Sequence, residues 1–183
     1  LHDFANVPEF KDTIAVKYPA IIMSISQISE TLFILAIPFF LRRFGIMQVM
    51  LFSMFAWVLR FGVFALGDPA DGLWMIILSC IVYGMAFDFF NISGSLFVET
   101  TTDSSIRSSA QGLFMMMTNG FGAYIGTVAS SWVIGNYFTT PAGQTDWSGA
   151  WYVFAIYSLI VAILFTILFR HKHNPEELSE ISH

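Results

Sequence analysis

The stretch LWMIILSCIVYGMAFDFFNISGSLFVE, residues 73–99, decides the fold of this chain. It is apolar and long enough for an α-helix to cross the hydrocarbon core of a bilayer, which takes about 20 residues. Yet Asp88 stands inside it, and the stretch contains no lysine or arginine to neutralise its charge. A charge at the centre of a spanning helix costs roughly 2.5–3.5 kcal/mol on insertion scales. We therefore interpret the stretch as a membrane helix whose aspartate has a function.

The composition of the whole chain agrees with this interpretation. Of the 183 residues, 56% are hydrophobic and only 11% are charged, whereas soluble domains carry about 25% charged residues. So few charges cannot cover a water-exposed surface, and the chain is predicted to be an all-α integral membrane protein. The net charge of −5 and the lack of a basic patch exclude nucleic acid as the expected partner. Cys80 is the single cysteine and cannot form an internal disulfide.

Five apolar runs are each long enough to cross a bilayer as a helix. Their residues continue without the alternation that is typical of membrane strands. The connections are short and contain Pro and Gly, so neighbouring helices are predicted to be antiparallel. In chain order we predict an outer segment at 1–17 (the end of a preceding helix and a loop), spans at 18–41, 46–67, 73–98, 108–134 and 149–169, and a tail at 170–183.

Lysine and arginine residues outside the spans are unevenly distributed, which predicts the orientation. Five of them fall on one side of the membrane: Arg42, Arg43, Arg107, Arg170 and Lys172. Only Lys11 and Lys17, both ahead of the first span, fall on the other side. We therefore expect a multi-pass protein of the inner (plasma) membrane with a cytoplasmic C-terminus. The sequence does not begin with Met and shows no signal peptide, so we interpret it as a piece of a longer protein.

Two acidic residues lie within predicted spans, Glu30 in the first and Asp88 in the third. A buried carboxyl that can gain and lose a proton is what a proton-coupled carrier needs, so both are candidates for proton coupling. Gln27 lies three residues before Glu30 and shares its helix face. The alternative for each acid is a structural role, either permanently protonated or paired with a helix outside this sequence.

A stripe of residues spaced by four, Tyr83, Phe87 and Asn91, runs beside Asp88. Two flat rings with a carboxyl and an amide nearby suit a planar solute that forms hydrogen bonds. The aromatic spacing alone would be typical of ordinary helix packing. The adjacent Asp88 favours a binding site instead. The predicted substrate-binding residues are Gln27, Glu30, Tyr83, Phe87, Asp88 and Asn91.

Other features of the sequence also carry expectations. Arg60 lies about seven residues from the outer end of its span and is expected to extend its charge to the membrane surface. The small-xxx-small pattern GAYIG, residues 122–126, predicts a close helix contact. No predicted span contains a histidine, and nothing resembles a nucleophile with its base. We therefore expect neither an enzyme nor a metal site.

Three separated blocks resemble the nucleoside:proton symporter family, within the major facilitator superfamily. They are SQISETLFILAIPFFLRRFG (26–45), YGMAFDFFNISGSLFVE (83–99) and IRSSAQGLFMMMTNGFG (106–122). The resemblance implies helices eight to twelve of a twelve-helix transporter, whose N-terminal half would be the partner of this chain. It also implies that the QISE and YGMAFD blocks help to line a nucleoside cavity between the two halves.

The predicted function is proton-coupled nucleoside uptake by alternating access around a site near the bilayer midplane. The proton is the coupling ion, and no other cofactor is expected. Asp88 and Glu30 stay equal candidates for carrying it. Two alternatives are left open: a carrier for another polar metabolite such as a sugar, or a non-transporting membrane scaffold or receptor whose acids are structural.

Overall fold

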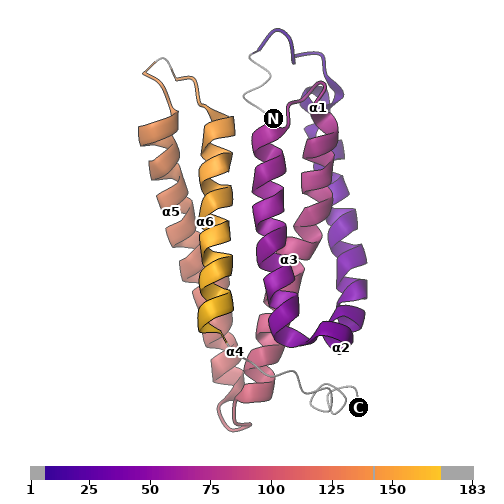
Figure 1. Cartoon of the computed structure of the whole chain (residues 1–183), viewed down its shortest axis with the longest axis vertical. Helices are drawn as coiled ribbons and strands as arrows, with labels where there is room; N and C mark the ends of the chain where they lie inside the picture. The colour runs from indigo at the N-terminus through magenta and orange to yellow at the C-terminus, as the bar shows by residue number, and fades with distance from the viewer. Residues whose placement is uncertain (1–6, 142, 170–183) are drawn as a thin grey trace.

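The structure, a computed structural model, describes residues 7–141 and 143–169. Residues 1–6 and the predicted tail at 170–183, with Arg170 and Lys172, lie outside the described residues. Over the described ranges the chain is folded as helices (Figure 1), and the β structure is limited to an isolated antiparallel bridge between Thr139 and Thr145.

The helices follow one another along the chain with short connections. The structure has helices α1 (Ile14–Lys17), α2 (Pro19–Leu66), α3 (Leu73–Thr101), α4 (Arg107–Met115), η2 (Met116–Gly122), α5 (Ala123–Val133), η3 (Ile134–Phe138) and α6 (Trp147–Leu168), of which η2 and η3 are π-helical. Among the described residues, α2, α3 and α6 are long and apolar enough to cross a bilayer. That each predicted span crosses the membrane stays a prediction.

Helix α2 folds back on itself at Gly45, which has φ 78° and ψ 167°. Residues with a Cβ rarely adopt this conformation, so glycine allows the chain to reverse here. We call residues 19–44 the first arm of α2 and residues 46–66 its second arm; the two arms run in opposite directions (Figure 1). The sequence predicted a connection over 42–45, but the helix continues to Phe44 and the reversal is made at Gly45.

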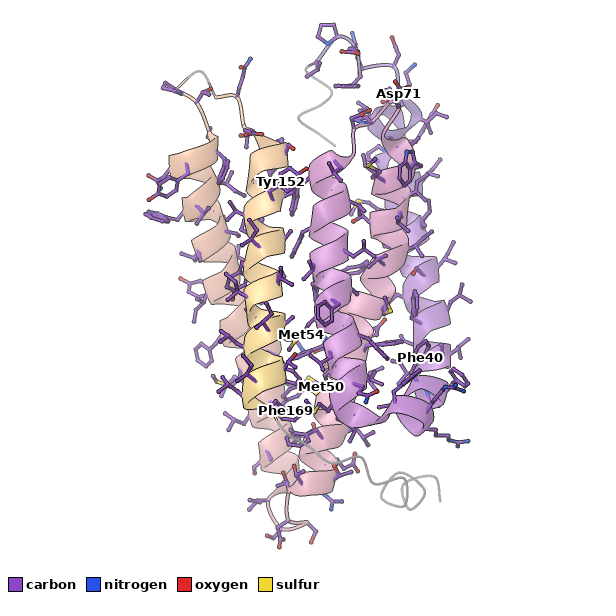
Figure 2. The ribbon with its side chains drawn as sticks, viewed as in Figure 1. Phe40, Met50, Met54, Asp71, Tyr152 and Phe169 are labelled. Carbon is purple, nitrogen blue, oxygen red and sulfur yellow. The ribbon has the colours of Figure 1, made fainter. Side chains whose placement is uncertain are left out.

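The bundle has two ends, which differ in charge. We call the end at Gly45 and the turn 102–106 the basic end, because Arg42, Arg43 and Arg107 lie there. The opposite end carries the loops 67–72 and 139–146 (Figure 1). Figure 2 shows Phe40 and Met50 toward the basic end and Asp71 at the opposite end.

Helix α3 packs against both arms of α2 and forms the core with them. The largest buried cluster lies toward the basic end and contains Ile37, Leu41, Ile46, Val49, Met50 and Phe89. Serine hydroxyls join the helices by donating to backbone carbonyls of a neighbouring helix, as small polar residues commonly do in membranes. They are Ser29 to Ile81, Ser53 to Ala86 at 2.9 Å, Ser79 to Arg60 at 3.4 Å and Ser148 to Ala65 at 2.6 Å.

The segment from α4 to η3, residues 107–138, is far less packed and contains no buried residue. At the basic end it meets α3, where a Cβ on Gly94 would lie 2.6 Å from the Phe114 ring. At the opposite end it meets α6, where a Cβ on Gly149 would lie 2.9 Å from Phe138. A Cβ on Gly126 would meet nothing within 4 Å, so the close contact predicted from GAYIG is not made at Gly126 with any described residue.

Candidate functional site

The first arm of α2 crosses α3 at Gly84, where the two backbones touch. A Cβ on Gly84 would lie 2.7 Å from the backbone nitrogen of Glu30 and 2.8 Å from its Cα. The Ser29 hydroxyl fixes the crossing by donating to the carbonyl of Ile81. This contact holds Glu30 against the segment of α3 that carries the predicted aromatic stripe. The sequence signal for it was a single glycine within a long apolar run.

Asp88 lies one turn along α3 from this crossing and is 6% exposed. Its Oδ2 is buried and has no hydrogen-bond partner among the described residues. Glu30 of the neighbouring arm is held against α3 one turn away, at Gly84. An unpartnered carboxyl oxygen among apolar groups is stabilised by a proton or by a donor from a bound solute. The pair of acids can therefore bind a proton, a hydrogen-bonding solute, or both.

Tyr83 and Phe87 form a stacked pair beside Asp88. Their ring centroids are 5.8 Å apart, with an interplanar angle of 23°. Trp57, from the second arm of α2, packs its ring against Tyr83 edge-on, at 6.1 Å and 83°. Aromatic pairs commonly take such stacked and edge-on arrangements. The rings of Tyr83 and Phe87 therefore offer flat faces beside Asp88, as a planar solute would require.

Arg60 joins this aromatic group and was not among the predicted site residues. Its Cζ lies 4.1 Å from the ring centroid of Tyr83, 5.2 Å from that of Trp57 and 5.5 Å from that of Phe64. Its Nε and Nη1 are buried and have no hydrogen-bond partner among the described residues. These contacts show the guanidinium packed among the rings, and whether Arg60 extends its charge to the membrane surface stays a prediction. Trp57 and Phe64, three residues before and four after it, were the available signal.

Gln27 and Asn91 lie at the margins of the crossing. Gln27 is exposed, one turn before Glu30 on the first arm. Asn91 is half-buried, and its Nδ2 donates to the carbonyl of Phe87 at 3.0 Å. Its Oδ1 is buried and has no partner among the described residues. The structure thus brings Glu30 to the helix that carries the stripe and Asp88; contact with a substrate stays a prediction for all six residues.

A cavity of about 290 Å³ opens on α3 toward the basic end. It begins one turn beyond Asp88 and extends toward the end of the helix. Its lining residues are Asn91, Ile92, Ser95, Leu96 and Glu99 of α3 and Met115 of α4. Its volume exceeds several-fold the roughly 30 Å³ that one molecule occupies in liquid water. Its lining is mostly apolar, with polar groups from Asn91, Ser95 and Glu99.

Comparisons with known proteins agree on one family. A family model described as nucleoside H+ symporter matches residues 1–174. The xanthosine permease of Escherichia coli is 57% identical over 179 residues, covering 97% of this chain and 42% of the permease. The nucleoside permease NupG of Escherichia coli is 53% identical over 186 residues, covering 100% of this chain and 44% of NupG.

Solved structures give the same result. One crystal structure of the nucleoside transporter NupG, of a variant with an aspartate replaced by alanine, has a TM-score of 0.87 at 53% identity, covering 92% of this chain and 42% of that chain. Another crystal structure of NupG has a TM-score of 0.86 at 54% identity, covering 93% and 42%. This chain therefore spans less than half the length of the relatives that it matches.

Proposed function

Since the chain belongs to the nucleoside H+ symporter family, we propose that it is the C-terminal half of a transporter that carries a nucleoside inward together with a proton. The observation that carries the proposal is Asp88, a buried acid with an unpartnered oxygen beside the stacked rings of Tyr83 and Phe87. A carboxyl of this kind can exchange a proton and can also bind a hydroxyl or amino group. The rings offer flat faces to a nucleobase.

The proposed mechanism is alternating access, in which two halves of the transporter rock about a central site. A proton from outside neutralises Asp88 or Glu30, which lowers the repulsion between the two acids. The base packs against Phe87 and Tyr83, while Gln27 and the acids form hydrogen bonds with the ribose. After the halves rock, loss of the proton inside restores the repulsion and releases the solute.

Uptake of labelled nucleosides into membrane vesicles tests this function. The full-length protein, with the N-terminal half that we expect before Leu1, should accumulate uridine, adenosine or xanthosine when the outside is acidic. Without a pH gradient, the label should only equilibrate. A labelled sugar serves as the competing solute. Accumulation of the sugar and not of any nucleoside would favour the metabolite carrier, and no transport at all would favour a scaffold or receptor.

Asp88→Asn separates binding from proton coupling. Asparagine keeps the shape and hydrogen-bonding capacity of the neutral acid but cannot release a proton. We expect the variant to bind nucleoside and to exchange it across the membrane, with pH-driven accumulation reduced at least tenfold. Glu30→Gln is the matched variant. If Asp88→Asn accumulates nucleoside as the parent does, the coupling proton belongs to Glu30 or to an acid outside this chain.

The proposed orientation places the basic end in the cytoplasm. Gln144 and Ser104 are both exposed and lie in connections at the two different ends, whereas the native Cys80 is buried. In intact cells, an impermeant thiol reagent should label Gln144→Cys and leave Ser104→Cys unlabelled. The reverse result would overturn the orientation and leave the transport proposal standing.

A further inference from the structure

A second set of residues, which we call the polar stripe, runs along one face of α3. It extends from Asp88 toward the basic end only. Its members are spaced by three, four and four residues, so they lie above one another on the helix. The polar members are Asp88, Asn91, Ser95 and Glu99. In the other direction the same face carries Gly84, Ile81 and Ile77. The polar side chains on this face therefore lie between Asp88 and the basic end, and the apolar ones lie on the other side of Asp88.

The packing on this face of α3 also differs between the two directions from Asp88. Toward the opposite end, Gly84 lies against the backbone of the first arm and the carbonyl of Ile81 is bonded by Ser29, so the helices leave no gap there. Toward the basic end, Asn91, Ser95 and Glu99 line the cavity of about 290 Å³. Asp88 therefore lies between a sealed helix contact and an open cavity, which Asn91, Ser95 and Glu99 line together with apolar side chains.

The groups along the cavity can bind water. The Oδ1 of Asn91 is an acceptor without a partner among the described residues; it is covered in this structure, so a water molecule can reach it only after neighbouring side chains move. Ser95 is held in place by Gln111 of α4: its Oγ donates to Oε1 at 2.9 Å, and Nε2 donates to the Ser95 carbonyl at 2.7 Å. The Ser95 oxygen can still accept, so one hydrogen-bond acceptor stands on each turn between the two acids.

Glu99 is the last residue of the polar stripe and lies in the final turns of α3. It is half-buried and forms no ion pair with any described residue. Among the described residues, the other charged groups near this end are Asp103 in the adjoining turn, Arg107 at the start of α4, and Arg42 and Arg43 on α2. A solvated acid at a helix end is common, but Glu99 lines the cavity instead of facing away from it.

Building on the proposed function, we propose that Glu99 is the proton acceptor at the inner end of a water-filled path from Asp88. The Asp88 O–H bond breaks and its proton passes to cavity water held by Asn91 and Ser95. A proton of that water chain then forms the O–H bond of Glu99. Glu99 finally releases the proton to water on the inner side, and Asp88 is left as the carboxylate.

The test measures proton release apart from nucleoside movement. In vesicles of full-length protein with an acidic outside, Glu99→Gln should slow pH-driven accumulation about tenfold, while nucleoside binding and exchange stay as in the parent. A small proton acceptor such as imidazole, enclosed inside the vesicles, should restore the rate of Glu99→Gln and leave the parent unchanged. Glu99→Asp keeps a carboxyl at this place and should retain most of the rate. A residue with a structural role would not respond to the buffer.

Asp103→Asn is the matched control, because it removes the same charge at the same end. The carboxylate of Asp103 accepts from the backbone nitrogen of Ser105 at 2.9 Å and from its Oγ at 2.8 Å, and it does not line the cavity. We expect its accumulation rate to match that of the parent. Unchanged accumulation by Glu99→Gln, or a loss that imidazole does not restore, would overturn the role of Glu99. A parent that exchanges nucleoside without pH-driven accumulation would overturn the proposed function as well.

Discussion

The crossing of α2 with α3 and the segment 107–138 are built in opposite ways. At the crossing the backbones touch at Gly84, and serine hydroxyls join the helices. The segment 107–138 meets its neighbours near its two ends, exposes most of its apolar side chains, and passes through two π-helical stretches. Close backbone contact fixes positions, whereas long helices held near their ends can change shape and partner.

This difference separates the part of the candidate site that the described residues hold from the part that they do not. Glu30 is held by the backbone contact at Gly84 and the Ser29 hydrogen bond, and Tyr83 and Phe87 stack on each other. The segment 107–138 exposes apolar side chains, among them Leu113, Phe121 and Tyr124. We expect the N-terminal half or lipid to cover this face, and the predictions below test the comparison.

The largest effect is expected from Gly84→Ala. The added methyl would fall within 3 Å of the backbone of Ser29 and Glu30, which cannot move aside as a side chain can. Overpacking of this kind destabilises by about 1–3 kcal/mol or more. We expect a clearly lower melting temperature of the purified full-length protein, together with loss of nucleoside binding.

Gly126→Ala is the matched control, because a Cβ there meets nothing within 4 Å. Alanine favours a helix over glycine by up to about 1 kcal/mol, so this variant should melt at the same temperature as the parent or higher. If both variants lower the melting temperature equally, the N-terminal half packs closely on Gly126. The few contacts of segment 107–138 would then be a property of this chain by itself, and the segment would be closely packed in the whole transporter.

Phe87→Ala should have the next largest effect, on affinity and not on folding. Loss of a ring that stacks on a nucleobase costs about 1–3 kcal/mol, which is roughly 5- to 150-fold in the dissociation constant. Phe154→Ala is the control, since Phe154 is also half-buried but packs against Phe61 and Trp151, away from both acids. Calorimetric titration of nucleoside into the two folded variants measures this. Equal affinities would remove the aromatic stripe from the site.

The fold class and the family could be predicted from the sequence because their signals are local and strong. Apolar runs of spanning length indicated the fold class, and the blocks around Glu30 and Asp88 indicated the family. The family model and the NupG structures confirm both. The aromatic contacts of Arg60 were not predicted, because the rings around it come partly from another helix. The π-helical stretches and the touching backbones at Gly84 depend on tertiary packing, which the spacing of residues along one helix does not reveal.

The smallest effect is expected from Arg60→Gln. The directions in which its melting temperature and KM change distinguish a role in packing from a role in the site. The Nε and Nη1 of Arg60 are buried without a partner among the described residues, which is unfavourable, and the contacts of the guanidinium with the rings oppose this cost. Those contacts are worth about 0.5–2 kcal/mol. We therefore expect Arg60→Gln to melt near the parent temperature, yet to raise the KM for nucleoside a few-fold, because Tyr83 loses the cation that holds its ring. Arg60→Lys keeps the charge without the flat face and should fall between the two. A melting temperature well below that of the parent, with an unchanged KM, would show that Arg60 serves packing of the second arm and not the site.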